Sequence, residues 1–239
     1  MKKQSESFVG GALILSLGGL LAKILGALYR IPLTNIVGSY GMGLYQLVFP
    51  PYILFLTVAQ AGVPVALSKL IAENNQLGNP SQGRKVFGYA MGLLAVVGVA
   101  MAALMAGLSH FIAAAQGNAD TAAAFVVVAP ALLFVPVTNV LKGYFQGNMN
   151  MVPSGATSVI EQLVKLTVGL TLAVRFMPDV HKAVMGAVWA ITVSEFSSLV
   201  IMSVVYLVHR RRTKLPRVTI AKQDIAPISK SVFALAVPV

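Results

Sequence analysis

The sequence contains no cysteine, which excludes disulfides, thiolate metal sites and catalysis by a thiol. Charged residues are also scarce: they make up 10% of the 239 residues, whereas ordinary soluble domains are about a quarter charged. Acidic residues are the scarcer kind, with 7 Asp and Glu against 18 Lys and Arg. So few charges cannot cover the surface of a soluble domain of this size, and the composition favours a protein surrounded by lipid.

Recognisable catalytic motifs are missing as well. The three histidines, His110, His181 and His209, lie near the ends of the predicted helices and far apart in sequence. The sequence has no HExxH motif, no GxSxG motif and no phosphate-binding loop. We therefore expect no catalytic residue, no metal site and no cofactor, and a function that involves no covalent chemistry.

Long apolar runs dominate what is present. Hydrophobic residues make up 57% of the chain, and the mean hydropathy is +0.80. A membrane-spanning helix needs about 20 mostly apolar residues, whereas a β-barrel would show shorter alternating segments. Six runs meet the helical criterion: residues 9–28, 44–70, 86–106, 121–140, 156–176 and 184–208. The sequence predicts an all-α polytopic membrane protein whose residues 1–208 form a six-helix transmembrane lobe.

Basic residues gather in the loops on one side of this predicted lobe. These loops carry Lys2, Lys3, Arg84, Lys85, Lys142, Arg210, Arg211, Arg212, Lys214 and Arg217. The positive-inside rule places this side, with the N-terminus, in the cytoplasm, and we expect a multi-pass protein of the cytoplasmic (inner) membrane. The net charge of +11 is then topological, and no nucleic acid is expected as a partner. Lys69 and Lys142 are expected to anchor cytoplasmic helix ends.

The chain changes character after the sixth run. Residues 209–229 are basic, contain two prolines and are predicted to form a cytoplasmic linker that can lie on anionic lipid. Residues 230–239 start another apolar run, which we interpret as the beginning of a truncated seventh transmembrane helix. A C-terminal lobe is therefore expected as a missing partner from the same chain. Within the spans, Gly10, Gly11, Gly18 and Gly19 and the Gly88-x3-Gly92 pair are typical of close helix contacts.

Ionisable residues inside the spans are the candidates for a site. Each costs about 2.5 to 3.5 kcal/mol at a helix centre, so each should face protein or water. Lys23 and Arg30 are seven residues apart and share nearly the same helix face. We predict that they line a cationic cavity with Lys165 and bind an anion such as a diphosphate. Glu161 and Glu195 would balance the cavity charge or carry a proton.

The same residues also permit a purely structural interpretation. Glu161 and Lys165, spaced i to i+4, can pair with each other. In that case Glu195 would pair with Lys23 to hold the bundle together, and the Arg30 side chain would reach the outer interface.

Several short strings occur in order along the chain. They are Lys-Ile-Leu-Gly at 23–26, Tyr-Arg-Ile-Pro at 29–32, Ala-Gly-Val-Pro at 61–64, Lys-Gly-Tyr-Phe-Gln-Gly at 142–147 and Glu-Gln-Leu-Val-Lys at 161–165. Together they resemble the N-terminal half of a polysaccharide biosynthesis or stage V sporulation protein B-like transporter. Those transporters belong to the multidrug/oligosaccharidyl-lipid/polysaccharide (MOP) exporter superfamily. The resemblance covers essentially the whole chain.

The resemblance implies two six-helix lobes that face each other and work by alternating access. It implies a flippase or exporter for an anionic, polyprenyl-diphosphate-linked saccharide or peptidoglycan precursor, with membrane lipid as the other partner. Lys23 matches a basic position on the first helix of related lipid II flippases, and Arg30 falls at the basic cluster that follows. Glu161, Gln162 and Lys165 match a Glu-Gln-x-x-basic string of the family.

Two other functions remain open at this point. A cation-coupled multidrug exporter of the same superfamily would bind cationic drugs, and its cavity should be acidic. A non-transporting membrane scaffold for cell-wall or spore-envelope synthesis would keep its function when Lys23 is neutralised. The surplus of basic over acidic groups in the spans favours the flippase over the drug exporter.

Overall fold

The computed structural model describes residues 2–60, 62–213 and 228–229, and within these ranges the chain is helical with no strand. The predicted all-α fold is therefore confirmed. The elements are α1 (Lys2–Leu47), α2 (Phe49–Gln60), α3 (Val63–Gln76), α4 (Pro80–Gly107), α5 (Ser109–Ala115), the 3-10 helix η1 (Ala119–Thr121), α6 (Ala122–Val128), α7 (Ala131–Gly147), α8 (Val152–Phe176) and α9 (Val180–Arg212).

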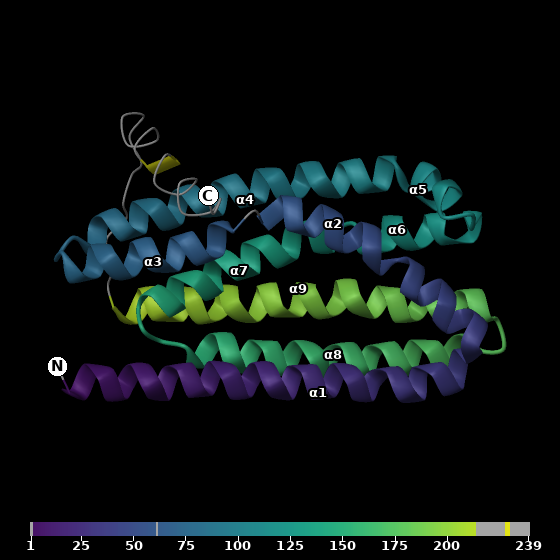
Figure 1. Cartoon of the computed structure of the whole chain (residues 1–239), viewed down its shortest axis with the longest axis horizontal. Helices are drawn as coiled ribbons and strands as arrows, with labels where there is room; N and C mark the ends of the chain where they lie inside the picture. Colours follow the sequence, from purple (N-terminus) through teal and green to yellow (C-terminus); the bar gives the residue numbers. More distant parts are fainter. Residues whose placement is uncertain (1, 61, 214–227, 230–239) are drawn as a thin grey trace.

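The apolar helices are long enough for a multi-pass membrane protein. Four segments of 25 to 33 residues qualify as spans, namely α4, η1 to α7, α8 and α9. The fifth segment, Gly10–Gln76, has 67 residues and is far too long for one crossing at about 1.5 Å per residue. In Figure 1, α1 runs in one direction and α2 and α3 return in the other. The outward and return paths of this segment therefore hold the first two predicted runs, residues 9–28 and 44–70.

Two predicted boundaries were wrong. The first helix does not end near Leu28 but continues to Val37, and the non-helical Gly38, where φ is +71°, separates it from a second helical piece of α1 that ends at Leu47. The run that was expected to start a second helix at residue 44 thus begins inside α1. The last helix continues to Arg212 rather than ending at Val208, so the first residues of the predicted linker are helical. Residues 214–227 and 230–239, which hold the rest of that linker and the predicted seventh helix, lie outside the described residues.

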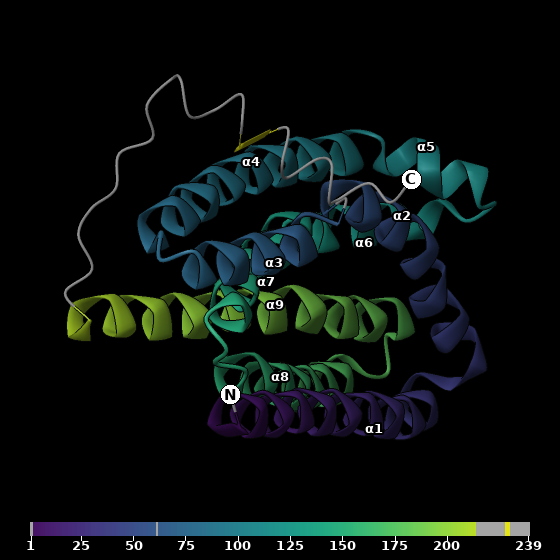
Figure 2. The same cartoon turned by 60° about the vertical axis from the view of Figure 1, so that its left-hand side comes forward.

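The helices form two groups joined by α7. The part of α1 before the kink at Gly38 lies beside α8, and α8 lies beside α9, as both views show (Figures 1 and 2). On the other side, α3, α4 and α7 pack against one another. Because α7 also contacts α9, it connects the two groups and is enclosed by both. This position decides what its polar side chains meet.

A glycine contact brings α1 close to α8. A Cβ atom on Gly18 would lie 2.9 Å from the Cα and carbonyl oxygen of Gly155, so this approach needs glycine. The close contact that the sequence predicted at Gly18 is thus confirmed. A Cβ on Gly10, Gly19 or Gly92 would meet no described residue within 4 Å, so the expectation of a close contact was wrong at these three positions.

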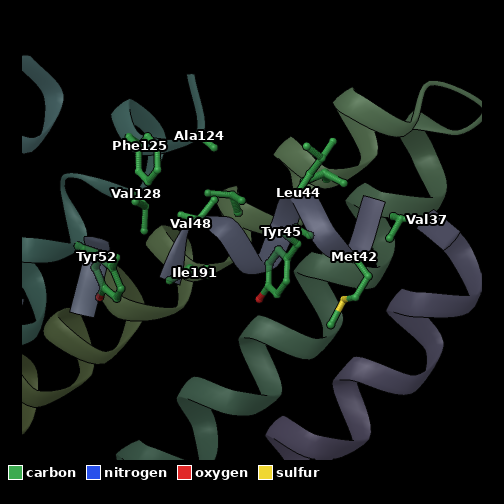
Figure 3. Packing of buried hydrophobic residues seen from close by; sticks show 14 of the residues in the cluster. Val37, Met42, Leu44, Tyr45, Val48, Tyr52, Ala124, Phe125, Val128 and Ile191 are labelled. Atoms are coloured by element: carbon green, nitrogen blue, oxygen red, sulfur yellow. The ribbon is translucent and has the colours of Figure 1, made fainter. Parts of the chain in front are cut away.

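The larger hydrophobic cluster holds the segment after the α1 kink. Tyr45 and Val48 are 2% and 1% exposed, and they pack with Tyr52 of α2 against Phe125 of α6 and Ile191 of α9 (Figure 3). This cluster fixes the end of α1 across the bundle. It therefore sets one wall of the cavity described below.

The basic residues collect at one end of the bundle, as the loop pattern predicted. The N-terminus, the α3–α4 turn, the α7–α8 connection and the end of α9 lie at the same end in Figure 1. Arg84 and Lys85 follow the α3–α4 turn, and Arg210, Arg211 and Arg212 end α9.

Candidate functional site

The three predicted basic site residues line one cavity of about 420 Å³ between α1, α2 and α8, which we call the cationic cavity. Lys23 and Arg30 come from α1, two helical turns apart, and Lys165 comes from α8. The complete lining is Ala22, Lys23, Gly26, Ala27, Tyr29, Arg30, Tyr45, Phe49, Gln162 and Lys165.

The basic residues of the cationic cavity form no ion pair with a described carboxylate. In the part of the chain that the structure describes, no carboxylate oxygen lies within 4.0 Å of the charged nitrogens of Lys23, Arg30 or Lys165. The Lys165 Nζ instead lies 6.0 Å from the centroid of the Tyr29 ring, at the outer limit of a cation–π contact. The Tyr29 ring is 2% exposed and packs directly against Gly169 of α8.

A second cavity of about 300 Å³ lies between α1, α7, α8 and α9, and we call it the polar cavity. Its lining residues are Gly19, Ala22, Val135, Thr138, Asn139, Lys142, Ser158, Glu161, Gln162 and Glu195. Both predicted acidic residues, Glu161 and Glu195, therefore face the same space. Ala22 and Gln162 line both cavities, so the two spaces are neighbours.

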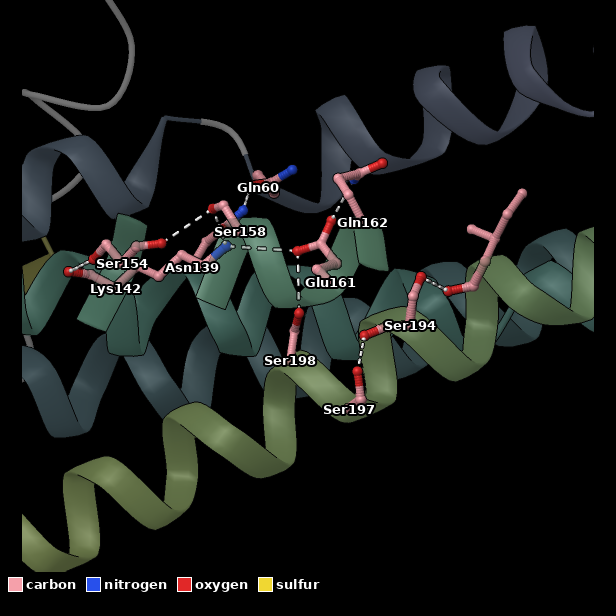
Figure 4. Close-up of polar contacts among 11 residues, drawn as sticks. Gln60, Asn139, Lys142, Ser154, Ser158, Glu161, Gln162, Ser194, Ser197 and Ser198 are labelled. Atoms are coloured by element: carbon pink, nitrogen blue, oxygen red, sulfur yellow. Dashed lines mark hydrogen bonds and ion pairs between the residues drawn. The ribbon is translucent and has the colours of Figure 1, made fainter. Parts of the chain in front are cut away.

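Glu161 is the centre of a polar network in this second cavity (Figure 4). The Lys142 Nζ lies 3.7 Å from its Oε2, and the two side chains are only 15% and 16% exposed. The Ser198 hydroxyl donates to the same Oε2 at 3.1 Å, and the Gln162 amide donates to Oε1 at 3.2 Å. The Lys142 ammonium also donates to the Ser158 hydroxyl at 3.2 Å. Both carboxylate oxygens of Glu161 thus have donors from neighbouring side chains.

These contacts correct two pairings that the sequence suggested and the role expected for Lys142. Glu161 forms its ion pair with Lys142 of α7, not with Lys165. Lys142 is therefore not the cytoplasmic anchor that was expected, because α7 is enclosed between two helix groups and directs this side chain inward. Glu195 lines the polar cavity, whereas Lys23 lines the cationic cavity, so the suggested Glu195–Lys23 pair is not formed in the described structure.

Sequence reasoning also missed several neutral polar residues. The Asn139 amide donates to Gln60 Oε1 at 2.6 Å and so joins α7 to α2. The Thr138 hydroxyl is buried and has no hydrogen-bond partner among the described residues. Thr138, Asn139 and Lys142 occupy positions i, i+1 and i+4 of one otherwise apolar run. This spacing places them on one side of the helix and could have predicted that their side chains face the inside of the bundle.

Solved structures share the fold of this chain. A MOP superfamily transporter from Pyrococcus furiosus, whose published description speaks of a binding pocket of reversed polarity, aligns with a TM-score of 0.75 over 95% of this chain and 50% of its own. An outward-facing multidrug resistance transporter of the MATE family aligns with a TM-score of 0.71 over 94% of this chain and 52% of its own. Each is 16% identical in sequence, so these likenesses describe the fold alone. The chain has the fold of about half of a MOP superfamily transporter.

Sequence comparison gives the family. Residues 8–235 match the polysaccharide biosynthesis protein family, and the chain belongs to that family. It is similar to stage V sporulation protein B of Bacillus subtilis (strain 168), with 28% identity over 84% of this chain and 39% of that protein. It is also similar to the lipid II flippase MurJ of the same organism, with 32% identity over 68% of this chain and 31% of that protein. The chain thus spans less than half the length of these relatives.

Proposed function

We propose that the protein moves an anionic, polyprenyl-diphosphate-linked saccharide or peptidoglycan precursor across the cytoplasmic membrane by alternating access. The observation that carries this proposal is the cationic cavity. Lys23, Arg30 and Lys165 converge on one space of about 420 Å³, and no carboxylate of the described residues lies within ion-pair distance of them.

The chemistry of a diphosphate fits this arrangement. Lys23 and Arg30 are exposed on α1 and Lys165 is half-buried, and because charge within a membrane is costly, an anionic ligand at the cavity supplies a favourable counter-charge. The Arg30 guanidinium can grip a phosphate with two parallel hydrogen bonds, whereas Lys23 and Lys165 act as point charges. The family description and the name of the MurJ relative, a lipid II flippase, support a lipid-linked substrate. The positive-inside pattern supports an N-terminus in the cytoplasm, so that the substrate would enter from that side.

Substitution of Lys23 tests the proposal. The protein, purified at its full natural length, is reconstituted in liposomes with a fluorescent polyprenyl-diphosphate saccharide in the inner leaflet. We expect Lys23→Ala to slow the movement of the lipid to the outer leaflet about tenfold, because one charge-assisted contact to the diphosphate is lost. Lys23→Glu should slow it further, because the new carboxylate repels the phosphates.

Lys69→Ala is the matched control. The Lys69 side chain is 59% exposed, pairs with Glu73 on the surface of α3 and lines neither cavity. Its removal should leave the rate unchanged. Equal rates for the wild type and both Lys23 variants would contradict the proposed role of the cationic cavity, provided that the variants remain folded.

A drug exporter is the second candidate, and the two carboxylates of the polar cavity are the observation in its favour. Lys142 already neutralises one of them, which leaves less negative charge for a cationic drug. Ethidium efflux from the same liposomes separates the two functions. Efflux that depends on Glu195, together with no movement of the saccharide lipid, would establish the drug exporter. If the protein moves neither the saccharide lipid nor ethidium, the result favours the non-transporting membrane scaffold.

A further inference from the structure

Gln162 lies between the two cavities and lines both of them. It follows Glu161 directly on α8, and neighbouring residues on a helix point about 100° apart, so the two side chains cover adjacent faces. Glu161 faces α7 and α9, where it meets Lys142 and Ser198. Gln162 faces α1, where its Oε1 lies against Gly26. The residue is therefore the direct side-chain link between the cationic cavity and the Lys142–Glu161 ion pair.

The orientation of the Gln162 amide follows from its neighbours. Its Nε2 donates to Glu161 Oε1 at 3.2 Å, and an ionised carboxylate only accepts hydrogen bonds, so the amide nitrogen must face it. The amide oxygen then points toward α1. A Cβ at position 26 would lie 3.3 Å from this oxygen, which is a tight contact, so Gly26 provides the space that the side chain occupies.

We propose that Gln162 is a positioning residue that couples occupation of the cationic cavity to the geometry of the Lys142–Glu161 ion pair. This inference rests on the proposed function, since the ligand of the cationic cavity is taken to be a diphosphate. The amide nitrogen carries two hydrogens, of which one serves Glu161. The second can be donated to a phosphate oxygen in the cationic cavity once the amide turns, so a bound diphosphate and Glu161 draw on the same amide nitrogen.

The coupling has a structural consequence on the far side of α8. Glu161 is held at Oε1 by Gln162 and at Oε2 by Ser198 and Lys142. When the Gln162 amide turns toward a phosphate, its hydrogen bond to Glu161 Oε1 weakens. The Glu161 carboxylate is then held mainly by the partners of its Oε2, Ser198 and Lys142. Conversely, a substitution that removes a partner of Glu161 Oε2 changes the strength of the hydrogen bond between Glu161 Oε1 and the Gln162 amide. Linkage requires that the two effects are reciprocal.

A double-mutant cycle tests the coupling without changing any charge. Ser198→Ala removes a donor from Glu161 Oε2, and Ser198 is fully buried on α9 and lines neither cavity. Gln162→Leu removes the amide at similar size. Binding of farnesyl diphosphate to the detergent-solubilised protein at its full natural length is measured for the wild type, both single variants and the double variant. We expect Ser198→Ala to change the Kd about threefold in the wild-type background and not at all in the Gln162→Leu background.

A second serine provides the matched control. Ser194 is buried on the same helix, and its hydroxyl donates within the helix to the Ile191 carbonyl at 2.8 Å. Ser194→Ala should leave the Kd unchanged in both backgrounds. Melting temperatures of all variants exclude a general loss of folding as the cause of any change.

Each result of the cycle has one meaning. If the effect of Ser198→Ala disappears with Gln162→Leu, the amide carries the coupling. If Ser198→Ala has the same effect in both backgrounds, or none in the wild type, Gln162 does not couple the cavities, and the proposed function stands. If the wild type does not bind farnesyl diphosphate, the anionic substrate is wrong and the coupling is overturned with it.

Discussion

Replacing Lys142 with methionine is expected to lower the free energy of unfolding by about 3 kcal/mol, because it leaves a buried carboxylate without its cation. Glu161 is 16% exposed, and Lys142 supplies both the opposite charge at 3.7 Å and a hydrogen bond to Ser158. The remaining donors to Glu161, from Gln162 and Ser198, are neutral and cannot replace a full charge. Reversible unfolding of the purified protein by SDS in mixed micelles measures the change.

Two further variants separate the ion pair from the loss of a long side chain. Lys142→Met combined with Glu161→Gln removes both charges, and its stability should return close to that of the wild type, since neutral replacements of buried pairs are often tolerated. Lys69→Met removes a surface cation whose pair with Glu73 is half exposed, and should change stability by no more than about 0.5 kcal/mol. If Lys142→Met is as stable as the wild type, Glu161 does not need its ion pair.

The all-α membrane fold was predictable because length and hydropathy suffice for it. A run of about 20 apolar residues is long enough to cross a membrane, and five helical segments of the described chain meet this criterion. The path of α1 beyond residue 28 was not predictable in the same way. In the segment after Gly38, Tyr45 and Val48 pack against α6 and α9. A hydropathy average over neighbouring residues contains no information on such long-range contacts, which can override local preferences.

The candidate site was predictable in part for a related reason. The seven-residue spacing of Lys23 and Arg30 alone predicts that they share a helix face. Lys165 was assigned to the same cavity because a charged side chain within a span is costly unless it faces protein or water. The partner of Glu161 was missed because spacing along α8 offers Lys165, whereas the fold offers Lys142 of α7. Which of two lysines pairs with a glutamate depends on helix neighbours, and a single sequence does not contain them.

A methyl group on Gly18 is expected to lower the free energy of unfolding by about 2 kcal/mol, because overpacking at a backbone contact forces whole helices to move. In Gly18→Ala the new Cβ would lie 2.9 Å from the Cα and carbonyl oxygen of Gly155, where no flexible side chain can yield. The displacement would carry Lys23 and Arg30 on α1 away from Lys165 on α8, since both helices wall the cationic cavity. Farnesyl diphosphate binding should therefore weaken together with stability.

Gly10 supplies the comparison for this prediction on the same helix. A Cβ at position 10 meets no atom of the described residues within 4 Å, so Gly10→Ala adds the same methyl group to α1 without a clash. It should leave stability and ligand binding unchanged or slightly improve stability, because alanine favours a helix over glycine by about 1 kcal/mol. The difference between the two variants, measured by SDS unfolding and by Kd, isolates the α1–α8 contact. Equal behaviour of Gly18→Ala and Gly10→Ala would mean that the contact does not position the basic residues.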